Sequence, residues 1–242
     1  MSGLKVLIAG VCALVLAGCE TLDKTVDAVD AAGISRIGAV AGLSDRMNHT
    51  HAGLNFSANG WQVRMVPEWD MPGIAEASLA AALEKTRKFS DVGIVDIGEL
   101  NRLSFKKNKA GLLAAAKAQG FDTVALILPM WRVHGSALVP GYGVFHGETL
   151  GVVTAHCSYQ QTVIYVFNVA TGKQIAWDHG YSLWDGACGD SSIAFKPDVD
   201  SYTEEEMEAI KLEIAAAFDL EFERTVRQLG FGAARDRHAV GK

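Results

Sequence analysis

Residues 159–183 read YQQTVIYVFNVATGKQIAWDHGYSL. Both halves of this stretch are rich in β-branched and aromatic residues, which favour strands. Between them, Ala170-Thr171-Gly172 suits a three-residue turn whose glycine takes the left-handed conformation, so that Val169 pairs with Lys173. The sequence therefore predicts a long hairpin that runs from residue 149 to 168 and returns from 173 to 183.

The turn also sets the register of the two strands. Side chains on one face of an antiparallel pair meet directly across the strands. This register makes His179 a histidine packed among apolar and aromatic side chains of the hairpin. The predicted pairs are Phe167 with Ile175, Tyr165 with Trp177, Val163 with His179, and Tyr159 with Leu183.

Helix and strand patterns alternate on either side of the hairpin. Strands are predicted at 61–66, 91–97 and 122–128, and helices at 74–88 and 108–119. The strand at 122–128 is almost wholly apolar, as expected of a strand that is covered on both faces.

A long C-terminal helix begins at a capping box formed by Thr203 and Glu206, and ends at Gly230. The elements together predict one α/β (α+β) domain over residues 60–231. It has a mixed sheet of about five strands with the long C-terminal hairpin, packed by two or three helices including this last one. The apolar stripe of the last helix comprises Met207, Ile210, Ile214, Phe218, Phe222, Val226 and Leu229.

The whole chain has 242 residues, 49% of them hydrophobic, and a formal net charge of −6. This composition excludes wholesale disorder. Acidic residues outnumber basic ones, so no cationic surplus is available to face a phosphate backbone. We therefore expect no binding to nucleic acid.

The N-terminus has the pattern of an export signal. Residues 1–18 carry one positive charge, Lys5, before an apolar run that is too short to span a membrane. The run ends in Leu16-Ala17-Gly18-Cys19, which resembles the lipobox of bacterial lipoproteins. The resemblance implies that Cys19 becomes the first residue of the mature chain. It would carry a diacylglycerol on its sulfur and an acyl chain such as palmitate on its amine.

The residue after the lipid site bears on which membrane holds the anchor. In lipoproteins of this kind, aspartate at that position retains the protein in the inner membrane, whereas this chain has Glu20. For an envelope with two membranes, we expect a lipid-anchored protein in the periplasmic leaflet of the outer membrane.

The segments that flank the domain are predicted to be irregular. Residues 19–59 are rich in Ala, Gly, Ser and Asp, which is typical of a tether, and residues 232–242 of a disordered tail. As an alternative within the tether, apolar residues recur at threes and favour a helix that docks on the domain. These residues are Ile34, Ile37, Val40 and Leu43.

Export leaves two cysteines that can pair. Cys12 is lost with the signal and Cys19 carries the lipid, so Cys157 and Cys188 remain. In an oxidising periplasm we expect a disulfide between them. Two buried free thiols are the alternative.

Three segments of the domain resemble a pattern found in envelope proteins. They are residues 89–96 (FSDVGIVD), residues 118–125 (AQGFDTVA) and the turn at 169–173 (VATGK). The pattern is similar to the periplasmic α/β domains of the curli-secretion lipoprotein, the N-terminal domain of the Tol-system propeller protein, and lipoprotein activators of penicillin-binding proteins. The resemblance implies a non-enzymatic module that binds an envelope partner, and it transfers no functional residue.

A glycine-rich segment at 129–151 is the candidate for partner binding. Its glycines work against regular packing, while its large side chains offer contact area to an envelope protein or a cell-wall glycan. We expect Trp131, Tyr142, Phe145 and His146 to form the binding surface. The alternative is a wide hairpin whose aromatic side chains fold back onto the sheet.

Histidines supply the remaining candidate chemistry. His49 and His51 lie two residues apart, which on a strand places both on one side, and His134, His146 and His156 are further candidate ligands. No closed ligand spacing links them, so we expect His49 and His51 to be solvated tether residues, with no metal and no cofactor. The alternative function is a periplasmic hydrolase or metal-dependent enzyme. It would use His156, His179, Asp185 and Asp190.

Overall fold

The computed structural model describes residues 25–26, 33–53, 59–98, 100–105, 107–134, 137–149, 152–181 and 191–231. In this part of the chain, nine strands form one sheet and three α-helices pack on it. The strands are β1 (Arg36–Ala41), β2 (Arg46–Ala52), β3 (Gly60–Met65), β4 (Asp91–Ile94), β5 (Thr123–Pro129), β6 (Trp131–His134), β7 (Ala137–Thr149), β8 (Val152–Asn168) and β9 (Gln174–Tyr181). The helices are α3 (Met71–Lys85), α4 (Lys109–Ala118) and α5 (Glu204–Val226).

The sheet is mixed, with the strand order β3-β2-β7-β8-β5-β1-β4, while β6 pairs with β7 and β9 with β8. Strands β1 and β4, β1 and β5, and β2 and β7 are parallel, and the other pairs are antiparallel. This confirms the predicted fold class, although the sheet has more strands than the five expected.

Strand β8 joins the two halves of the sheet. Its first part, residues 152–161, pairs with β7, and its second part pairs with β5 and β9. The β8–β9 hairpin confirms the predicted pairs Tyr165–Trp177 and Val163–His179. The predicted partner of Phe167 is wrong by one residue, because a bulge places Gln174 opposite it.

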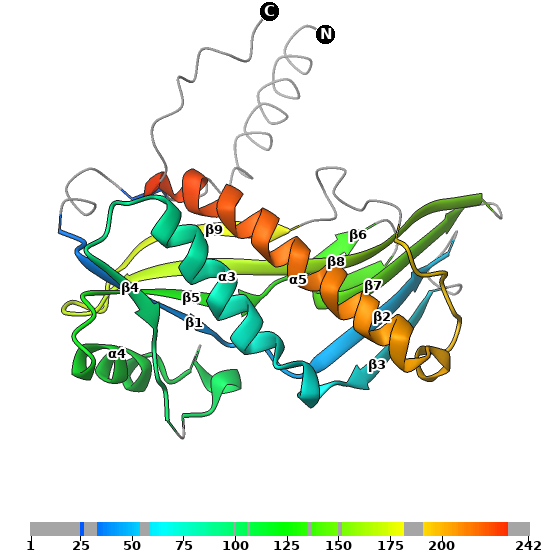
Figure 1. Ribbon diagram of the computed structural model, residues 1–242, viewed down its shortest axis with the longest axis horizontal. Coiled ribbons are helices and arrows are strands. Elements are labelled where there is room, and N and C mark those ends of the chain that lie inside the picture. Colours follow the sequence, from blue (N-terminus) through cyan, green and yellow to red (C-terminus); the bar gives the residue numbers. More distant parts are fainter. Residues whose placement is uncertain are drawn as a thin grey trace, which may run out of the picture.

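Helices α3 and α5 lie side by side across one face of the sheet, and α4 covers the other face (Figure 1). The side chains of β5 show this division, since alternate residues of a strand point to opposite faces. Ala125 and Ile127 belong to the core under α3 and α5, whereas Val124 and Leu126 belong to the core under α4. The prediction that this strand is covered on both faces is therefore confirmed.

Helix α5 begins as predicted. The Thr203 side chain accepts from the Glu206 amide, and the Glu206 carboxylate accepts from the Thr203 amide. The chain turns away at Gly230, whose φ is 94°. All seven residues of the predicted apolar stripe are buried, so this helix supplies much of the core between the helices and the sheet.

The predicted extent of the tether is wrong, because β1 and β2 are paired strands of the sheet and not a linker or a helix. The small residues that made this stretch read as a tether serve close packing. A Cβ on Gly38 would lie 2.5 Å from Val95 Cγ2 and 3.1 Å from the Phe121 ring. The folded domain also begins earlier in the chain than predicted, since the Val26 amide donates to the Leu229 carbonyl in the π-helical turn that follows α5 (Arg227–Phe231).

The segment 129–151 is also more regular than expected. It contributes β6 and β7, and β7 lies between β2 and β8. Gly143 allows this arrangement, because a Cβ there would stand 1.8 Å from the Asn48 carbonyl oxygen of β2. Glycine in this segment therefore permits close strand pairing.

Several predictions fall on residues that the structure does not describe. These are the signal and lipobox at 1–19, Glu20, the tail at 232–242, and Leu183, Asp185, Cys188 and Asp190. Among the residues that are described, no helix is long and apolar enough to cross a membrane.

Candidate functional site

A row of histidines crosses three adjacent strands. His51 of β2 pairs with His146 of β7, and His146 pairs with His156 of β8. The ring centroids are 5.5 Å apart in the first pair and 5.4 Å in the second. His49 lies two residues before His51 and so points to the same face. These side chains and the ring of Phe195 are called the histidine cluster below.

Phe195 brings the cluster together from the segment that precedes α5. Its ring stacks on His49 at 4.8 Å and on His146 at 4.2 Å, with interplanar angles of 8° and 13°. It also contacts His51 and His156 at centroid distances of 5.7 and 5.9 Å. One phenyl ring therefore touches four imidazoles.

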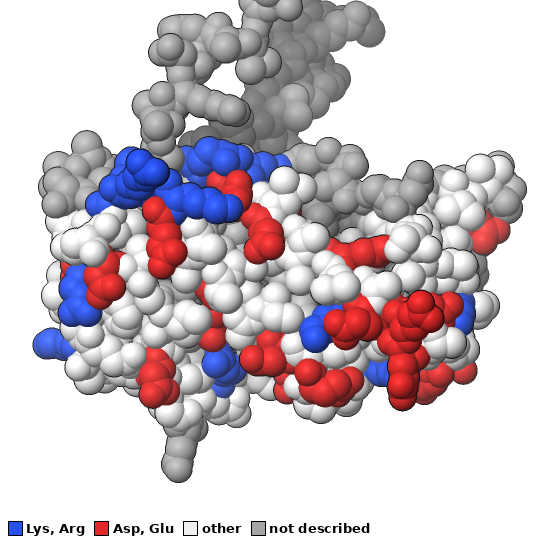
Figure 2. Space-filling view, in the orientation of Figure 1, with Lys and Arg blue, Asp and Glu red and all other residues white. Residues whose placement is uncertain are grey.

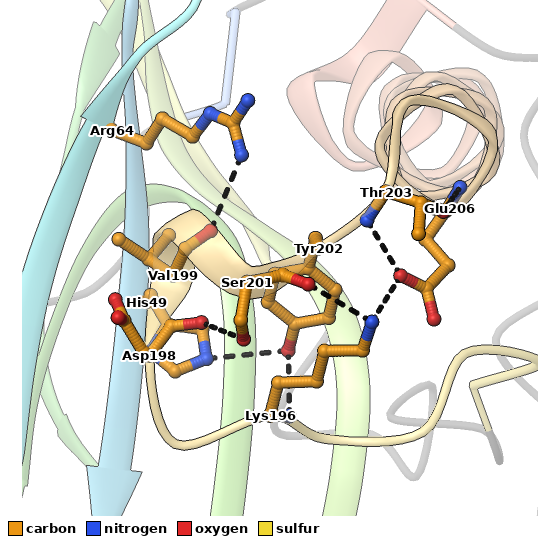
Figure 3. Close-up of polar contacts among 9 residues, drawn as sticks. All are labelled: His49, Arg64, Lys196, Asp198, Val199, Ser201, Tyr202, Thr203 and Glu206. Carbon is orange, nitrogen blue, oxygen red and sulfur yellow. Dashed lines mark hydrogen bonds and ion pairs between the residues drawn. The ribbon is translucent and has the colours of Figure 1, made fainter.

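Phe195 belongs to the segment at 191–203, which is called the strap below. Lys196, the next residue, fixes the position of the strap through its polar contacts (Figure 3). The Lys196 amide donates to the Tyr202 hydroxyl at 3.2 Å, and that oxygen lies 3.2 Å from His49 Nε2. The Lys196 ammonium donates to the Ser201 carbonyl and to the carboxylate of Glu206, the residue that caps α5. The start of α5 and the cluster are thus held in one network.

The first residues of the strap are held by Glu213 of α5. Its carboxylate accepts from the Ser191 hydroxyl, from the Ser192 amide and hydroxyl, and from the Ser158 hydroxyl of β8. Burial opposes ionisation of this carboxyl, but the four hydrogen bonds outweigh it and lower the pKa. His156 closes the same end, because its Nε2 atom contacts the Ile193 carbonyl oxygen.

Two imidazoles of the cluster, those of His49 and His146, have a lowered pKa and are neutral at pH 7. Burial, with a smaller contribution from His156 and His146, outweighs the hydrogen bond at the Lys196 backbone and lowers the pKa of His49 to about 4. Burial is also the main reason that the pKa of His146 is lowered, with His156 and His51 adding to the effect. A neutral imidazole keeps one nitrogen lone pair available to a ligand.

A cavity of about 300 Å³ opens beside the cluster. Gly60 of β3 is the residue opposite His51, so no side chain stands at that position. Glu148 of β7 lies at the rim, with Oε2 3.9 Å from His51 Nε2. The cavity is lined by His49, His51, Gly60, Gln62, His146, Glu148, Phe195 and Pro197.

A second surface feature lies on the opposite face of the sheet, because Trp61 and Gln62 are consecutive on β3. The Trp61 and Trp131 side chains are 55% and 57% exposed, and their rings meet edge to face at 6.3 Å. They line a groove of about 130 Å³, called the tryptophan groove below. The other lining residues are Leu43, Ser44, Arg46, Asn48, Pro129, Gly141 and Tyr142.

The structure keeps only part of the predicted binding surface together. Trp131 is exposed in the tryptophan groove, and Tyr142 also lines this groove, but Tyr142 and Phe145 are only 2% and 1% exposed and belong to the core. These two aromatic residues fold onto the sheet, as the alternative proposed. His146 lies in the histidine cluster, and His49 and His51 are paired sheet residues instead of solvated tether residues.

Of the residues named in the alternative enzyme hypothesis, the structure describes only His156 and His179, and it does not bring these two together. His179 pairs with Val163, an odd-numbered residue of β8, whereas His156 is even-numbered on the same strand. The two imidazoles therefore point to opposite faces of the sheet. His179 packs edge to face on Trp177 at 4.9 Å, in agreement with its predicted place among the hairpin aromatics.

Sequence reasoning missed Phe195, Trp61 and Glu148. The pair His146 and Glu148 repeats the two-residue spacing of His49 and His51, which was a usable signal once residue 146 was assigned to a strand. Nothing in the sequence around Phe195 indicates that it packs on strands far away in the chain.

Comparisons with known proteins give low similarity. No family model matches the chain, and no curated protein matches it. Among solved structures, the PelC dodecamer from Paraburkholderia phytofirmans is similar at 11% identity and a TM-score of 0.40, over 88% of this chain and 96% of that one. A DUF330 protein from Xanthomonas campestris is similar at 11% identity and a TM-score of 0.38, over 82% and 85%. Similarity of this extent transfers neither a family nor a residue role.

Proposed function

We propose that this chain is a periplasmic lipoprotein, anchored through Cys19 in the outer membrane, whose domain binds cell-wall glycan in the tryptophan groove without catalysing a reaction. The exposed pair of Trp61 and Trp131 carries the proposal. Large aromatic side chains contribute strongly to binding, and two exposed indoles in contact are a surface suited to that role.

The chemistry of the groove favours a sugar as the occupant. An indole face packs against the apolar C–H face of a sugar ring, and polar groups at the edge bind its hydroxyls. Here Arg46 and Ser44 line the groove beside the two indoles. Its volume is below the roughly 300–1,000 Å³ of a pocket that encloses a small molecule, so it suits a polymer bound one ring at a time.

Sedimentation with purified cell-wall sacculi tests the groove. The full-length chain in detergent is expected to sediment with the sacculi, and Trp61→Ala or Trp131→Ala to reduce the bound fraction severalfold. Leu103→Ala is the control, because Leu103 is exposed to a similar extent outside the groove. Undiminished binding of both tryptophan variants, or crosslinking from residue 131 to a protein in place of glycan, would contradict the proposal.

Mass spectrometry of the native product tests the anchor separately. We expect a mature chain that begins at an acylated Cys19, and a Cys19→Ala variant that leaves the membrane fraction. An unmodified residue 19 with the signal still attached would disprove the anchor and leave the groove to be judged by its own experiment.

A further inference from the structure

Two residues of the histidine cluster, together with Glu148 beside them, form the donor set of a metal site. One ligand atom from each of His51, His146 and Glu148 lies within 4.8 Å of the others. The three residues come from two adjacent parallel strands, with His51 and His146 at paired positions and Glu148 two residues later on β7. The site is therefore built on paired backbone, which holds such ligands more firmly than a loop does.

The distances are close to those that coordination requires. Zinc–ligand bonds of about 2.0–2.1 Å in a tetrahedron place the ligand atoms about 3.3–3.4 Å apart. His51 Nε2 and Glu148 Oε2 are 3.9 Å apart, so small side-chain rotations bring them to that spacing. Both side chains are partly exposed, at 32% and 40%, which leaves room for such rotations and a path for an ion.

A buried atom with no partner points to a ligand independently. The side chain of His146 is more than nine-tenths buried, and its Nδ1 atom has no hydrogen-bond partner. His156 Nδ1, in the adjacent strand, is also buried without one. Buried polar atoms are normally satisfied, so these imidazoles are placed for a partner that the protein itself does not supply.

The chemistry of the donors selects the kind of ion. Two imidazoles and one carboxylate suit zinc and related divalent transition ions, whereas calcium and magnesium prefer an all-oxygen set. We propose that His51, His146 and Glu148 bind one divalent transition-metal ion, with Zn²⁺ as the expected occupant, at the mouth of the cavity beside Phe195. Three protein ligands leave a coordination position open toward that cavity.

Calorimetric titration with Zn²⁺ tests the site. The probe is ZnCl₂ added to the untagged full-length chain in detergent, after treatment with a chelator. We expect one Zn²⁺ per chain, and a loss of affinity of more than about tenfold for His51→Ala and for Glu148→Gln. His179→Ala is the matched control, since it removes an imidazole on the opposite face and should leave the affinity unchanged.

A second measurement guards against misfolded variants. Co²⁺ in a tetrahedral site absorbs visible light, so the unaltered chain and His179→Ala should show that band and Glu148→Gln should lose or shift it. Glu148 is partly exposed, and its variant is expected to keep the circular dichroism spectrum of the unaltered chain. The proposal is overturned if Zn²⁺ does not bind stoichiometrically, or if it binds equally well to both ligand variants. Trp61→Ala should bind Zn²⁺ normally, which separates this result from that of glycan binding.

Discussion

Gly143 sets how closely β2 approaches β7, and so how closely His51 approaches His146. A Cβ at this position would overlap the Asn48 carbonyl oxygen at 1.8 Å, and backbone cannot move aside as a side-chain tip can. We predict that Gly143→Ala lowers the free energy of unfolding by several kcal/mol, on the order of other severe core defects. Denaturant titration monitored by circular dichroism measures it.

The control for Gly143→Ala is Gly60, another strand glycine, which lies opposite His51. A Cβ on Gly60 would meet only His51 Cβ, at an ordinary 3.7 Å. Gly60→Ala should therefore leave the denaturation midpoint nearly unchanged. Equal losses in the two variants would show that the close approach at Gly143 does not determine its effect.

Glu221 is a buried carboxyl whose ionisation opposes folding. Burial raises its pKa to about 7, although Arg224 Nη2 lies 2.8 Å from its Oε2 atom. Between the ordinary pKa of 4.5 and about 7, the folded chain holds this proton more tightly than the unfolded chain. The free energy of unfolding is therefore highest below pH 4.5. It falls by at most about 3 kcal/mol as the pH rises from 4.5 through about 7.

We predict that Glu221→Gln removes this loss, because the amide has no charge to desolvate. The variant should be more stable than the unaltered chain at pH 8, with the gain shrinking toward pH 4.5. Denaturant midpoints across that range measure it, and Glu205→Gln on the exposed side of α5 is the control. A constant difference at every pH would contradict the assignment.

At the level of whole elements, the strap depends on Glu213 for its first residues. Four hydrogen bonds from Ser158, Ser191 and Ser192 end on this one carboxylate. We predict that Glu213→Ala leaves the sheet folded but weakens the protection of strap amides against hydrogen exchange by about tenfold or more. Exchange measured by mass spectrometry should show the change at 191–196 and leave α3 unaffected.

Acid should also weaken the protection of the strap amides against hydrogen exchange in the chain without a substitution. The hydrogen bonds hold the pKa of Glu213 below its ordinary value, so they stabilise the fold above pH 4.5. This contribution is lost as the pH falls through the lowered pKa. Strap amides whose protection does not fall between pH 6 and the acid unfolding of the domain, after correction for intrinsic exchange, would refute the role of the carboxylate.

Helix α5 and the strap meet at the Thr203 cap. We predict that Thr203→Ala lowers the free energy of unfolding by about 1 kcal/mol, because it leaves the Glu206 amide without its acceptor. Thr203→Ser keeps a hydroxyl and should retain most of the stability. Thermal unfolding distinguishes the two, and equal losses would indicate that the methyl group, and not the cap, is what matters.

Across the whole molecule, sequence patterns predicted α5 and the β8–β9 hairpin because their information is local. A capping box, an apolar stripe and a turn each lie within a few residues of what they determine. Strands β1 and β2 were missed because their residues suit contacts with segments that are far away in the sequence, and not a local pattern. Gly38 is small because Phe121 packs over it, and the buried Asn48, His49 and Thr50 give β2 the polar composition of a loop.

The candidate site was predictable only in part for the same reason. The two-residue spacing of His49 and His51 was visible, but the row with His146 and His156 exists only through the pairing of β2, β7 and β8. Phe195 reaches the row through the strap, whose position depends on α5. A site assembled from four separate segments leaves no single motif in the sequence.

The disulfide bond between Cys157 and Cys188 remains a prediction. Cys157 is buried on β8, and Cys188 lies outside the described residues. A bridge would close a loop of about 32 residues, which on the chain-entropy model removes about 3–4 kcal/mol of unfolded-state freedom. We expect peptide mapping without reductant to recover residues 157 and 188 in one linked species. Recovery of both as separate, alkylated peptides would refute the bridge.

The hydrogen bond between the Val26 amide and the Leu229 carbonyl, three residues after α5, would limit how far a lipid-anchored domain stands from the membrane. With Cys19 as the proposed anchor, the connecting chain spans at most about 25 Å even when fully extended. Lys and Arg gather at this end of α5, while Asp and Glu gather toward its start (Figure 2). The Lys and Arg side chains near the C-terminal end of α5 would thus face the lipid headgroups. Glycan and metal would be met at the far pole, roughly one helix length, or about 35 Å, deeper into the periplasm.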